Sequence, residues 1–190
     1  GNRPVVQLDG HSDEVAFMVQ AIRPDGNLRI IPLGGWVTSN VPAHKVWVRN
    51  ALGEYIPGIV ASKPPHYMTE AERKAPLVFE NITVDVGAVS KEEAENEFHV
   101  RIGEPVVPDV TFTYDEKHDL MVGKSFDCRL GCASIVSTLR ELQGEELAVD
   151  VVGACCSQEE VGTRGSQVTC RTVNPDIAIV FEGCPADDTC

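Results

Sequence analysis

The sequence predicts an α/β protein in which a small barrel of short strands is inserted into a domain built on a parallel sheet. Residues 15–120 read mostly as short strands separated by turns, which is typical of a small barrel or sandwich. Residues 121–190 alternate helical periodicity with apolar runs, as in an α/β domain. The opening run 4–9 is a further apolar strand, so residues 1–14 belong with the C-terminal half.

The inserted region is a series of short strands joined by recognisable turns. Asp25-Gly26 between two apolar segments is a strong hairpin signal. Ser90, with Glu93 three residues later, predicts a capping box and a short polar helix over 90–97. Strands are expected at 15–22, 27–33, 45–49, 55–62, 82–86, 102–107 and 110–114.

The C-terminal half alternates helix and strand. Residues 128–142 carry apolar side chains at nearly helical spacing, and Gly144 ends that segment. The run 147–156 is almost continuously apolar, which predicts a strand covered on both faces. A helix over 161–173 and a second buried strand over 176–181 follow.

Composition excludes several classes of partner. The chain has 190 residues and a formal net charge of −13, which argues against nucleic-acid and anionic-membrane partners. No apolar run reaches the ~18 residues of a membrane span, and no secretory signal is visible. All seven cysteines lie at or after Cys128 without framework or zinc-knuckle spacing. We expect small buried thiols in a reducing compartment, the cytoplasm.

Polar residues gather where the predicted strands end. Ligands bind at the carboxyl ends of strands in an open α/β sheet, so these side chains mark a candidate site. The candidates are His11 and Asp13 after the first strand, Asp127 at the start of a helix, Glu159 and Glu160 after the strand 147–156, and Glu182 after the last strand.

Each candidate also has a structural explanation. Asp127 alone is more readily an N-cap. The Glu159-Glu160 pair is also explained as a solvated acidic turn. In the same way, His11 is explained as a loop histidine and Glu182 as the first residue of a loop. Their joint occurrence at one edge favours a cation that offsets clustered carboxylates. Histidine with Asp and Glu suits Zn²⁺, or Co²⁺ and Mn²⁺ with more oxygen ligands.

The adjacent glutamates divide naturally into two roles. One binds a metal, while its neighbour takes a proton from a water whose pKa the metal has lowered. Asp13, two residues after His11, is placed to orient the imidazole.

Longer stretches of the chain resemble the M42 metallo-aminopeptidases, the glutamyl aminopeptidase and tetrahedral-aminopeptidase group. The resemblance covers nearly the whole chain in order. It is carried by the stretches at 9–19, 32–36, 62–66, 85–94, 102–107, 123–132, 158–162 and 185–189.

The resemblance implies a phosphorylase/hydrolase-like α/β catalytic domain, residues 1–14 and 121–190, with residues 15–120 as a β-barrel for oligomerisation. It implies two divalent metal ions per subunit and removal of N-terminal residues from peptides. It also implies a homo-oligomer, with dimers that assemble into a dodecamer. The implied roles are His11 and Glu182 as ligands of one metal, Asp127 as the bridge, Glu160 as ligand of the other metal, Glu159 as general base, and Asp13 in support of His11.

The chain departs from the family pattern in three ways. Asp is more frequent than Glu at position 182, and Asn is more frequent than Cys at position 128. Family members also carry an N-terminal segment and a later segment with a further histidine ligand. We therefore expect this chain to be a fragment of a longer protein.

Two alternatives remain open at this stage. The same site suits a metal-dependent deacylase or amidohydrolase, because the same water attacks either carbonyl. A catalytically incomplete fragment that serves as an assembly module is the other alternative.

Overall fold

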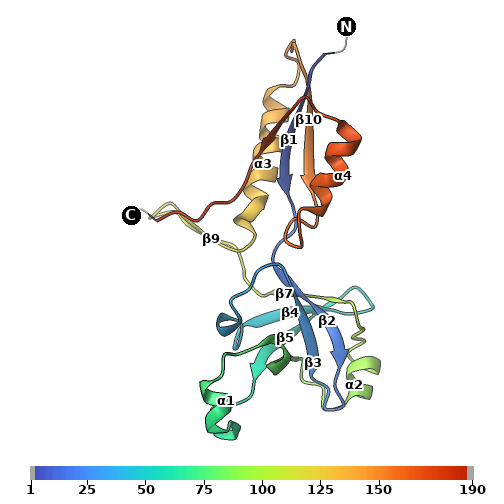
Figure 1. Cartoon of the computed structure of the whole chain (residues 1–190), viewed down its shortest axis with the longest axis vertical. Coiled ribbons are helices and arrows are strands. Elements are labelled where there is room, and N and C mark those ends of the chain that lie inside the picture. The colour runs from blue at the N-terminus through green and yellow to red at the C-terminus, as the bar shows by residue number, and fades with distance from the viewer. Residues whose placement is uncertain (1–2, 188–190) are drawn as a thin grey trace. The chain divides into compact units, whose positions relative to one another are not determined.

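The computed structural model describes residues 3–187 and divides into two compact units. One unit combines Gly1–Glu14 with Thr111–Cys190, and the other is Val15–Val110 (Figure 1). The sequence placed residues 111–120 in the inserted barrel, whereas the structure groups them with the α/β unit. The reason is strand pairing, because residues 113–115 pair with residues 120–122 and not with a strand of the barrel.

The α/β unit is built on a three-stranded parallel sheet in the order β10-β1-β11. Its strands are β1 (Val5–His11), β10 (Asp150–Cys156) and β11 (Ile177–Val180). The register places His11 opposite Cys156. Two neighbouring strands therefore end at the same edge, as the sequence predicted.

Helices α3 (Phe126–Glu141) and α4 (Arg164–Val173) cover opposite faces of this sheet (Figure 1). On the α3 face, Gly153 has no side chain where a Cβ would lie 2.7 Å from Cγ2 of Ile135. On the α4 face, Gln7 donates to Cys170 and Cys156 contacts Thr169. The glycine thus allows close packing of α3, while polar contacts dominate beneath α4.

Burial within the sheet differs from the prediction. Residues Gln7 to His11 of β1 are buried, as expected of a central strand. All four residues of β11 are exposed, and β10 is only partly buried. Both helices contact β10, as expected of a strand covered on both faces, although its burial is incomplete. The expectation that β11 is buried is wrong for the described residues, because β11 is an edge strand and the two helices contact mainly β1 and β10.

The other unit contains a closed six-stranded barrel in the order β2-β3-β6-β5-β4-β7. The strands are β2 (Ala16–Ile22), β3 (Leu28–Leu33), β4 (Lys45–Arg49), β5 (Tyr55–Ser62), β6 (Ile82–Asp85) and β7 (Pro105–Pro108). Its core is formed by fully buried side chains such as Phe17, Leu28 and Ile82. The Asp25-Gly26 turn joins β2 to β3, with Gly26 at φ +85°, where glycine is favoured.

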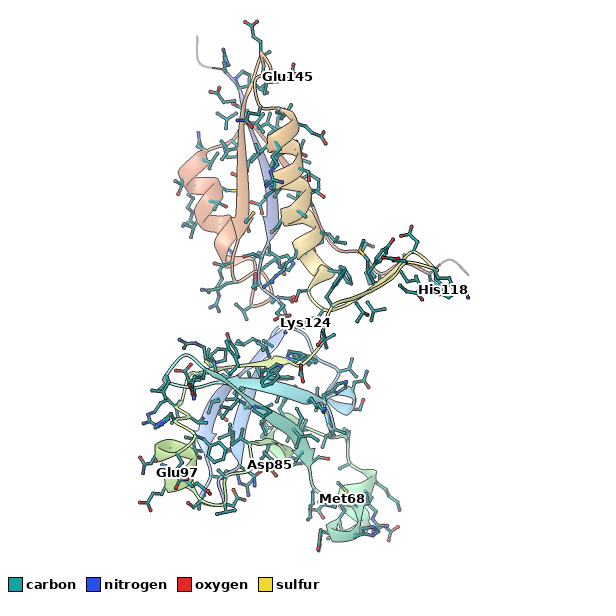
Figure 2. The ribbon with its side chains drawn as sticks, turned by 180° about the vertical axis from the view of Figure 1, so that it is seen from behind. Met68, Asp85, Glu97, His118, Lys124 and Glu145 are labelled. Carbon is teal, nitrogen blue, oxygen red and sulfur yellow. The ribbon has the colours of Figure 1, made fainter. Side chains whose placement is uncertain are left out.

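The segment 110–114 was expected as a barrel strand, and that expectation is wrong. The strand that overlaps its end, β8 (Thr113–Asp115), pairs with β9 (Leu120–Val122) in a separate two-stranded hairpin, and with no barrel strand between residues 3 and 187. His118 lies at its tip (Figure 2), with Nδ1 2.7 Å from Oδ2 of Asp115. An alternating pattern does not specify which strand becomes the partner.

Two short helices flank the barrel strands. In α2 (Lys91–Asn96), Ser90 caps the helix as predicted, but the Glu93 carboxylate accepts from the Val89 N–H, so the reciprocal half of the box is shifted by one residue. Helix α1 (Glu70–Lys74) was not predicted, although its Thr69 and Glu72 form a complete capping box. Short 3₁₀ turns occur at Thr38–Asn40, Pro65–Tyr67 and Phe79–Asn81.

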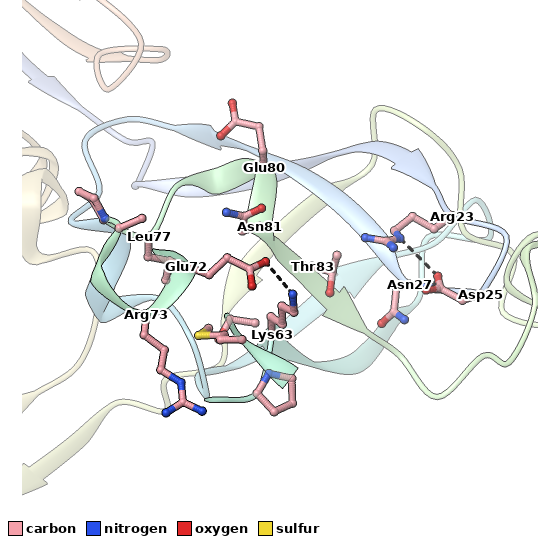
Figure 3. Close-up of a pocket in the computed structure, with 15 residues that line it drawn as sticks. Arg23, Asp25, Asn27, Lys63, Glu72, Arg73, Leu77, Glu80, Asn81 and Thr83 are labelled. Carbon is pink, nitrogen blue, oxygen red and sulfur yellow. Dashed lines mark hydrogen bonds and ion pairs between the residues drawn. The ribbon is translucent and has the colours of Figure 1, made fainter. Parts of the chain in front are cut away.

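The barrel unit has a cavity of about 690 Å³ lined largely by charged and polar side chains (Figure 3). The residues that line it form two ion pairs, Lys63 with Glu72 at 2.6 Å and Arg23 with Asp25 at 3.6 Å. Positive and negative side chains therefore compensate one another locally. None of the helices between residues 3 and 187 combines the length and apolar character required of a membrane span.

Candidate metal centre

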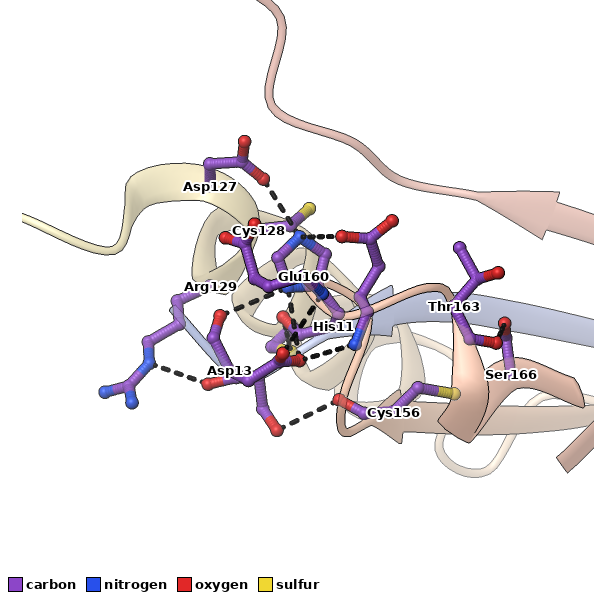
Figure 4. Close-up of polar contacts among 12 residues, drawn as sticks. His11, Asp13, Asp127, Cys128, Arg129, Cys156, Glu160, Thr163 and Ser166 are labelled. Atoms are coloured by element: carbon purple, nitrogen blue, oxygen red, sulfur yellow. Dashed lines mark hydrogen bonds and ion pairs between the residues drawn. The ribbon is translucent and has the colours of Figure 1, made fainter. Parts of the chain in front are cut away.

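His11 is the central residue of the candidate site. It is the last residue of β1 and is only 3% exposed. Its Nδ1 lies 3.1 Å from the main-chain oxygen of Asp13, and its Nε2 lies 2.9 Å from Oδ1 of Asp127 (Figure 4). With Nδ1 as donor to that carbonyl, Nε2 is the nitrogen that faces the carboxylates.

Asp127 reaches the site from the start of α3. The N-cap residue of that helix is Ser125, and Asp127 itself has extended dihedral angles of φ −81° and ψ 113°. Extended angles also occur at N-caps, but the contact that distinguishes Asp127 is the 2.9 Å approach of its carboxylate to His11 Nε2. Gly183, next to Glu182, allows the last segment to approach Asp127 closely, since a Cβ there would lie 3.0 Å from the Asp127 Cβ.

The carboxylate of Asp13 organises the loop after β10. It accepts hydrogen bonds from the backbone N–H groups of Glu159 and Glu160, at 3.1 and 3.2 Å. Its Oδ1 is 3.5 Å from His11 Nδ1, so the closer contact of the imidazole is with the Asp13 carbonyl. Asp13 thus contacts both His11 and the loop that carries Glu159 and Glu160.

Carboxylates from the other strand ends complete the cluster. Oε1 of Glu182 lies 3.5 Å and Oε2 of Glu159 lies 3.8 Å from His11 Nε2. Glu160 is drawn in the same group in Figure 4. All six side chains singled out in the sequence are therefore gathered at one edge of the sheet, within the α/β unit.

The electrostatics of this cluster favour a positive charge. Burial lowers the pKa of His11, but the hydrogen bond to Asp127 and the charges of Glu182, Glu159 and Asp13 together raise it above its ordinary value. Burial also raises the pKa of Glu160, and neighbouring carboxylates add to that effect. One imidazolium compensates at most one of these anionic charges, so the donor set fits a divalent cation.

One residue that lies in this group, Cys128, was not predicted as a site residue. One ligand atom from each of His11, Asp127, Cys128 and Glu182 lies within 4.8 Å of the other three. Cys128 is buried, and burial raises the pKa of its thiol. The expectation of buried thiols holds for Cys128 and Cys156, but Cys155, Cys170 and Cys184 are exposed, and Cys190 lies outside the described residues. The sequence feature that indicated Cys128 as a site residue was its position directly after the candidate ligand Asp127.

A cavity of about 370 Å³ adjoins the cluster. His11, Glu159 and Glu182 line it together with apolar residues of β11, including Val180. Such a cavity gives a small molecule or a chain terminus access to the carboxylates.

Comparison with known proteins relates this chain to a protein family. Residues 1–190 match the family model described as M42 glutamyl aminopeptidase. The glutamyl aminopeptidase of Lactococcus lactis is 32% identical over 190 residues, which cover 99% of this chain and 53% of that protein.

Solved structures are also similar. The TET aminopeptidase of the archaeon Thaumarchaeota archaeon SCGC AB-539-E09 has a TM-score of 0.92 and 39% identity, covering 99% of this chain and 53% of that one. The TET1 peptidase of Pyrococcus horikoshii, which can assemble into a tetrahedron or a large octahedral shell, has a TM-score of 0.82 and 25% identity, covering 97% of this chain and 55% of that one.

The chain therefore spans about half the length of the relatives it matches. The fold and the family match agree over the whole of the sequence given. This chain belongs to the M42 glutamyl aminopeptidase family.

Proposed function

We propose that this protein is a dinuclear metal-dependent aminopeptidase that removes N-terminal residues from peptides. The observation that carries the proposal is the cluster around His11, in which carboxylates from three strand ends and one helix start face a single buried imidazole. Membership of an aminopeptidase family supports the same substrate class.

The proposed ligands of one ion are His11, Asp127 and Glu182, and the proximity of their ligand atoms, within 4.8 Å of one another, supports this assignment. Asp127 is proposed as the bridge to a second ion held by Glu160. When bound, such a pair of divalent ions, Zn²⁺ being the expected metal and Co²⁺ or Mn²⁺ the alternatives, supplies Lewis acidity and lowers the pKa of a water. The protein contributes the positions of the ligand atoms.

Glu159 is the proposed general base. Its Oε2 lies 3.8 Å from His11 Nε2, but Glu159 is not one of the four residues whose ligand atoms lie within 4.8 Å of one another. Its backbone N–H donates to the Asp13 carboxylate. It accepts a proton from the attacking water and later delivers that proton to the leaving amine. Asp13 acts as a positioning residue, because it holds the backbone of both Glu159 and Glu160 and contacts His11.

The barrel unit is the proposed oligomerisation module. A closed barrel has no unpaired sheet edges, so association would occur through side chains and loops. The Pyrococcus horikoshii relative can assemble into a tetrahedron or a large octahedral shell, which supports a homo-oligomer. Dimers that assemble into a dodecamer are the proposed form. The described cysteines are all free, which supports the cytoplasm as the compartment.

A substrate panel tests the proposed reaction. Peptides with a free N-terminus and their N-acetylated counterparts are incubated with the protein, after chelation and again after addition of Zn²⁺ or Co²⁺. We expect hydrolysis of the free-amino peptides alone, lost on chelation and restored by metal. Faster hydrolysis of the acylated series would instead establish a deacylase, and activity that survives complete chelation would overturn the metal-dependent mechanism.

A further inference from the structure

The group around His11 contains a thiol in addition to its carboxylates. Cys128 is 1% exposed, and its Sγ is one of the four ligand atoms that lie within 4.8 Å of one another. The thiol donates a hydrogen bond to the main-chain oxygen of Phe181 at 3.1 Å. Because Phe181 directly precedes Glu182, this contact places the sulfur beside the segment that delivers a carboxylate to the site.

The four atoms match the ligand number and kinds that zinc takes in proteins. Zn–S bonds of about 2.3 Å and Zn–N or Zn–O bonds of about 2.0–2.1 Å imply neighbouring ligand atoms roughly 3.3–3.6 Å apart in a tetrahedron. His11 Nε2 lies 2.9 Å from Asp127 Oδ1 and 3.5 Å from Glu182 Oε1. The second separation lies within this range, the first is shorter, and Sγ of Cys128 lies within 4.8 Å of the other three atoms.

We propose that Cys128 is a further protein ligand, as thiolate, of the ion held by His11, Asp127 and Glu182. The inference rests on the proposed function in taking those three residues as ligands. On binding, a sulfur lone pair forms the bond to the metal, and the thiol proton leaves to solvent. Zinc also accepts a fifth ligand, so thiolate ligation leaves room for the reacting water.

Thiolate ligation changes which metals the site accepts. Sulfur is a soft ligand that favours Zn²⁺ and Co²⁺ over Mg²⁺ and Mn²⁺, which prefer oxygen. The competing arrangement keeps the thiol on the Phe181 carbonyl and leaves the ion with nitrogen and oxygen ligands alone. The two arrangements differ in whether a metal–sulfur bond exists, so spectroscopy separates them without an activity assay.

Cobalt substitution is the primary test. The protein is freed of metal and titrated with Co²⁺ while its absorption spectrum is recorded. We expect an intense near-ultraviolet sulfur-to-cobalt charge-transfer band in the wild type and in Cys132→Ser, and its loss in Cys128→Ser. Cys132 is the matched control, because it lies in the same helix and its thiol contacts the His11 carbonyl, yet it is outside the four-residue group.

A second measurement requires no variant. X-ray absorption of the zinc-loaded wild type is expected to show one sulfur neighbour at about 2.3 Å. Chelator competition is expected to show at least ~10-fold weaker zinc binding by Cys128→Ser than by Cys132→Ser. Circular dichroism of both variants checks that each is folded.

The outcomes separate this inference from the proposed function. Metal binding with only nitrogen and oxygen neighbours overturns the role of Cys128 and leaves the proposed aminopeptidase site intact. A metal–sulfur bond in a protein that hydrolyses no peptide supports Cys128 as a ligand and counts against the proposed function. Failure of the wild type to bind either metal overturns both.

Discussion

The carboxylate of Asp13 accepts the backbone N–H of Glu159 at 3.1 Å, and this contact joins the residues that follow β1 to the loop that follows β10. The same carboxylate accepts the N–H of Glu160 at 3.2 Å. A single side chain therefore holds both members of the glutamate pair, one proposed as base and the other as metal ligand. This relationship makes Asp13 a sensitive point for mutation.

Replacing Asp13 with Asn is expected to weaken metal binding roughly 10-fold to 100-fold. The amide has one acceptor oxygen, so its NH₂ group would face one of the two N–H donors, and the loop would shift. Metal affinity is measured by competition with a chromophoric chelator. Asp150→Asn is the matched control, because Asp150 is exposed and 4.0 Å from Arg3. Equal affinities in the two variants would show that Asp13 has no positioning role.

Replacing Glu159 with Gln is expected to lower turnover by roughly 10²-fold or more while bound metal is retained. The substitution keeps the size of the side chain and removes its ability to accept a proton. The readouts are kcat and metal content by elemental analysis. Glu146→Gln, in the exposed turn before β10, serves as control. Normal turnover in Glu159→Gln would assign the base to another residue.

The pH dependence of stability follows from His11. Because the carboxylates raise its pKa above 6.5 in the metal-free folded protein, His11 contributes stability below that value and loses it as pH rises through the folded pKa. The Tm of the metal-free wild type is expected to fall relative to His11→Asn as pH rises from about 6 to about 8.

Calorimetry of the metal-free proteins measures this difference, with His66→Asn, an exposed barrel histidine, as the control. A metal competes with the proton for the imidazole, so metal affinity is expected to fall as pH is lowered through the same range. A Tm difference between wild type and His11→Asn that does not change with pH contradicts the raised pKa.

The packing of α3 on the sheet predicts a cost for Gly153→Ala. The added Cβ would lie 2.7 Å from Ile135 Cγ2 and 2.8 Å from Leu139 Cδ1, so the helix must shift. We expect roughly 1–3 kcal/mol of destabilisation in urea unfolding followed by circular dichroism. Gly35→Ala, where no atom lies within 4 Å of the new Cβ, is expected to change stability by less than about 0.5 kcal/mol. Equal stability of the two variants would contradict the close approach of α3.

Several elements could be located from the sequence because their signals are local. The strands predicted at Lys45–Arg49 and Tyr55–Ser62 match β4 and β5 residue for residue. The partner of a strand is not a local property, and for that reason the segment that includes β8 was misassigned to the barrel. The exposure of β11 was also missed, because burial depends on which elements cover a strand rather than on its own apolar residues.

The sequence by itself determined the residue types of the site and the edge at which they meet, because parallel strands end at the same side of a sheet. Only the tertiary structure decided where each side chain points. The backbone leaves the helical conformation at Asp127 and Cys128, and the ligand atoms of both residues lie within 4.8 Å of that of His11. The β1–β10 register places the glutamate loop within reach of the Asp13 carboxylate. These directions arise from backbone angles and long-range pairing, which residue spacing alone does not encode.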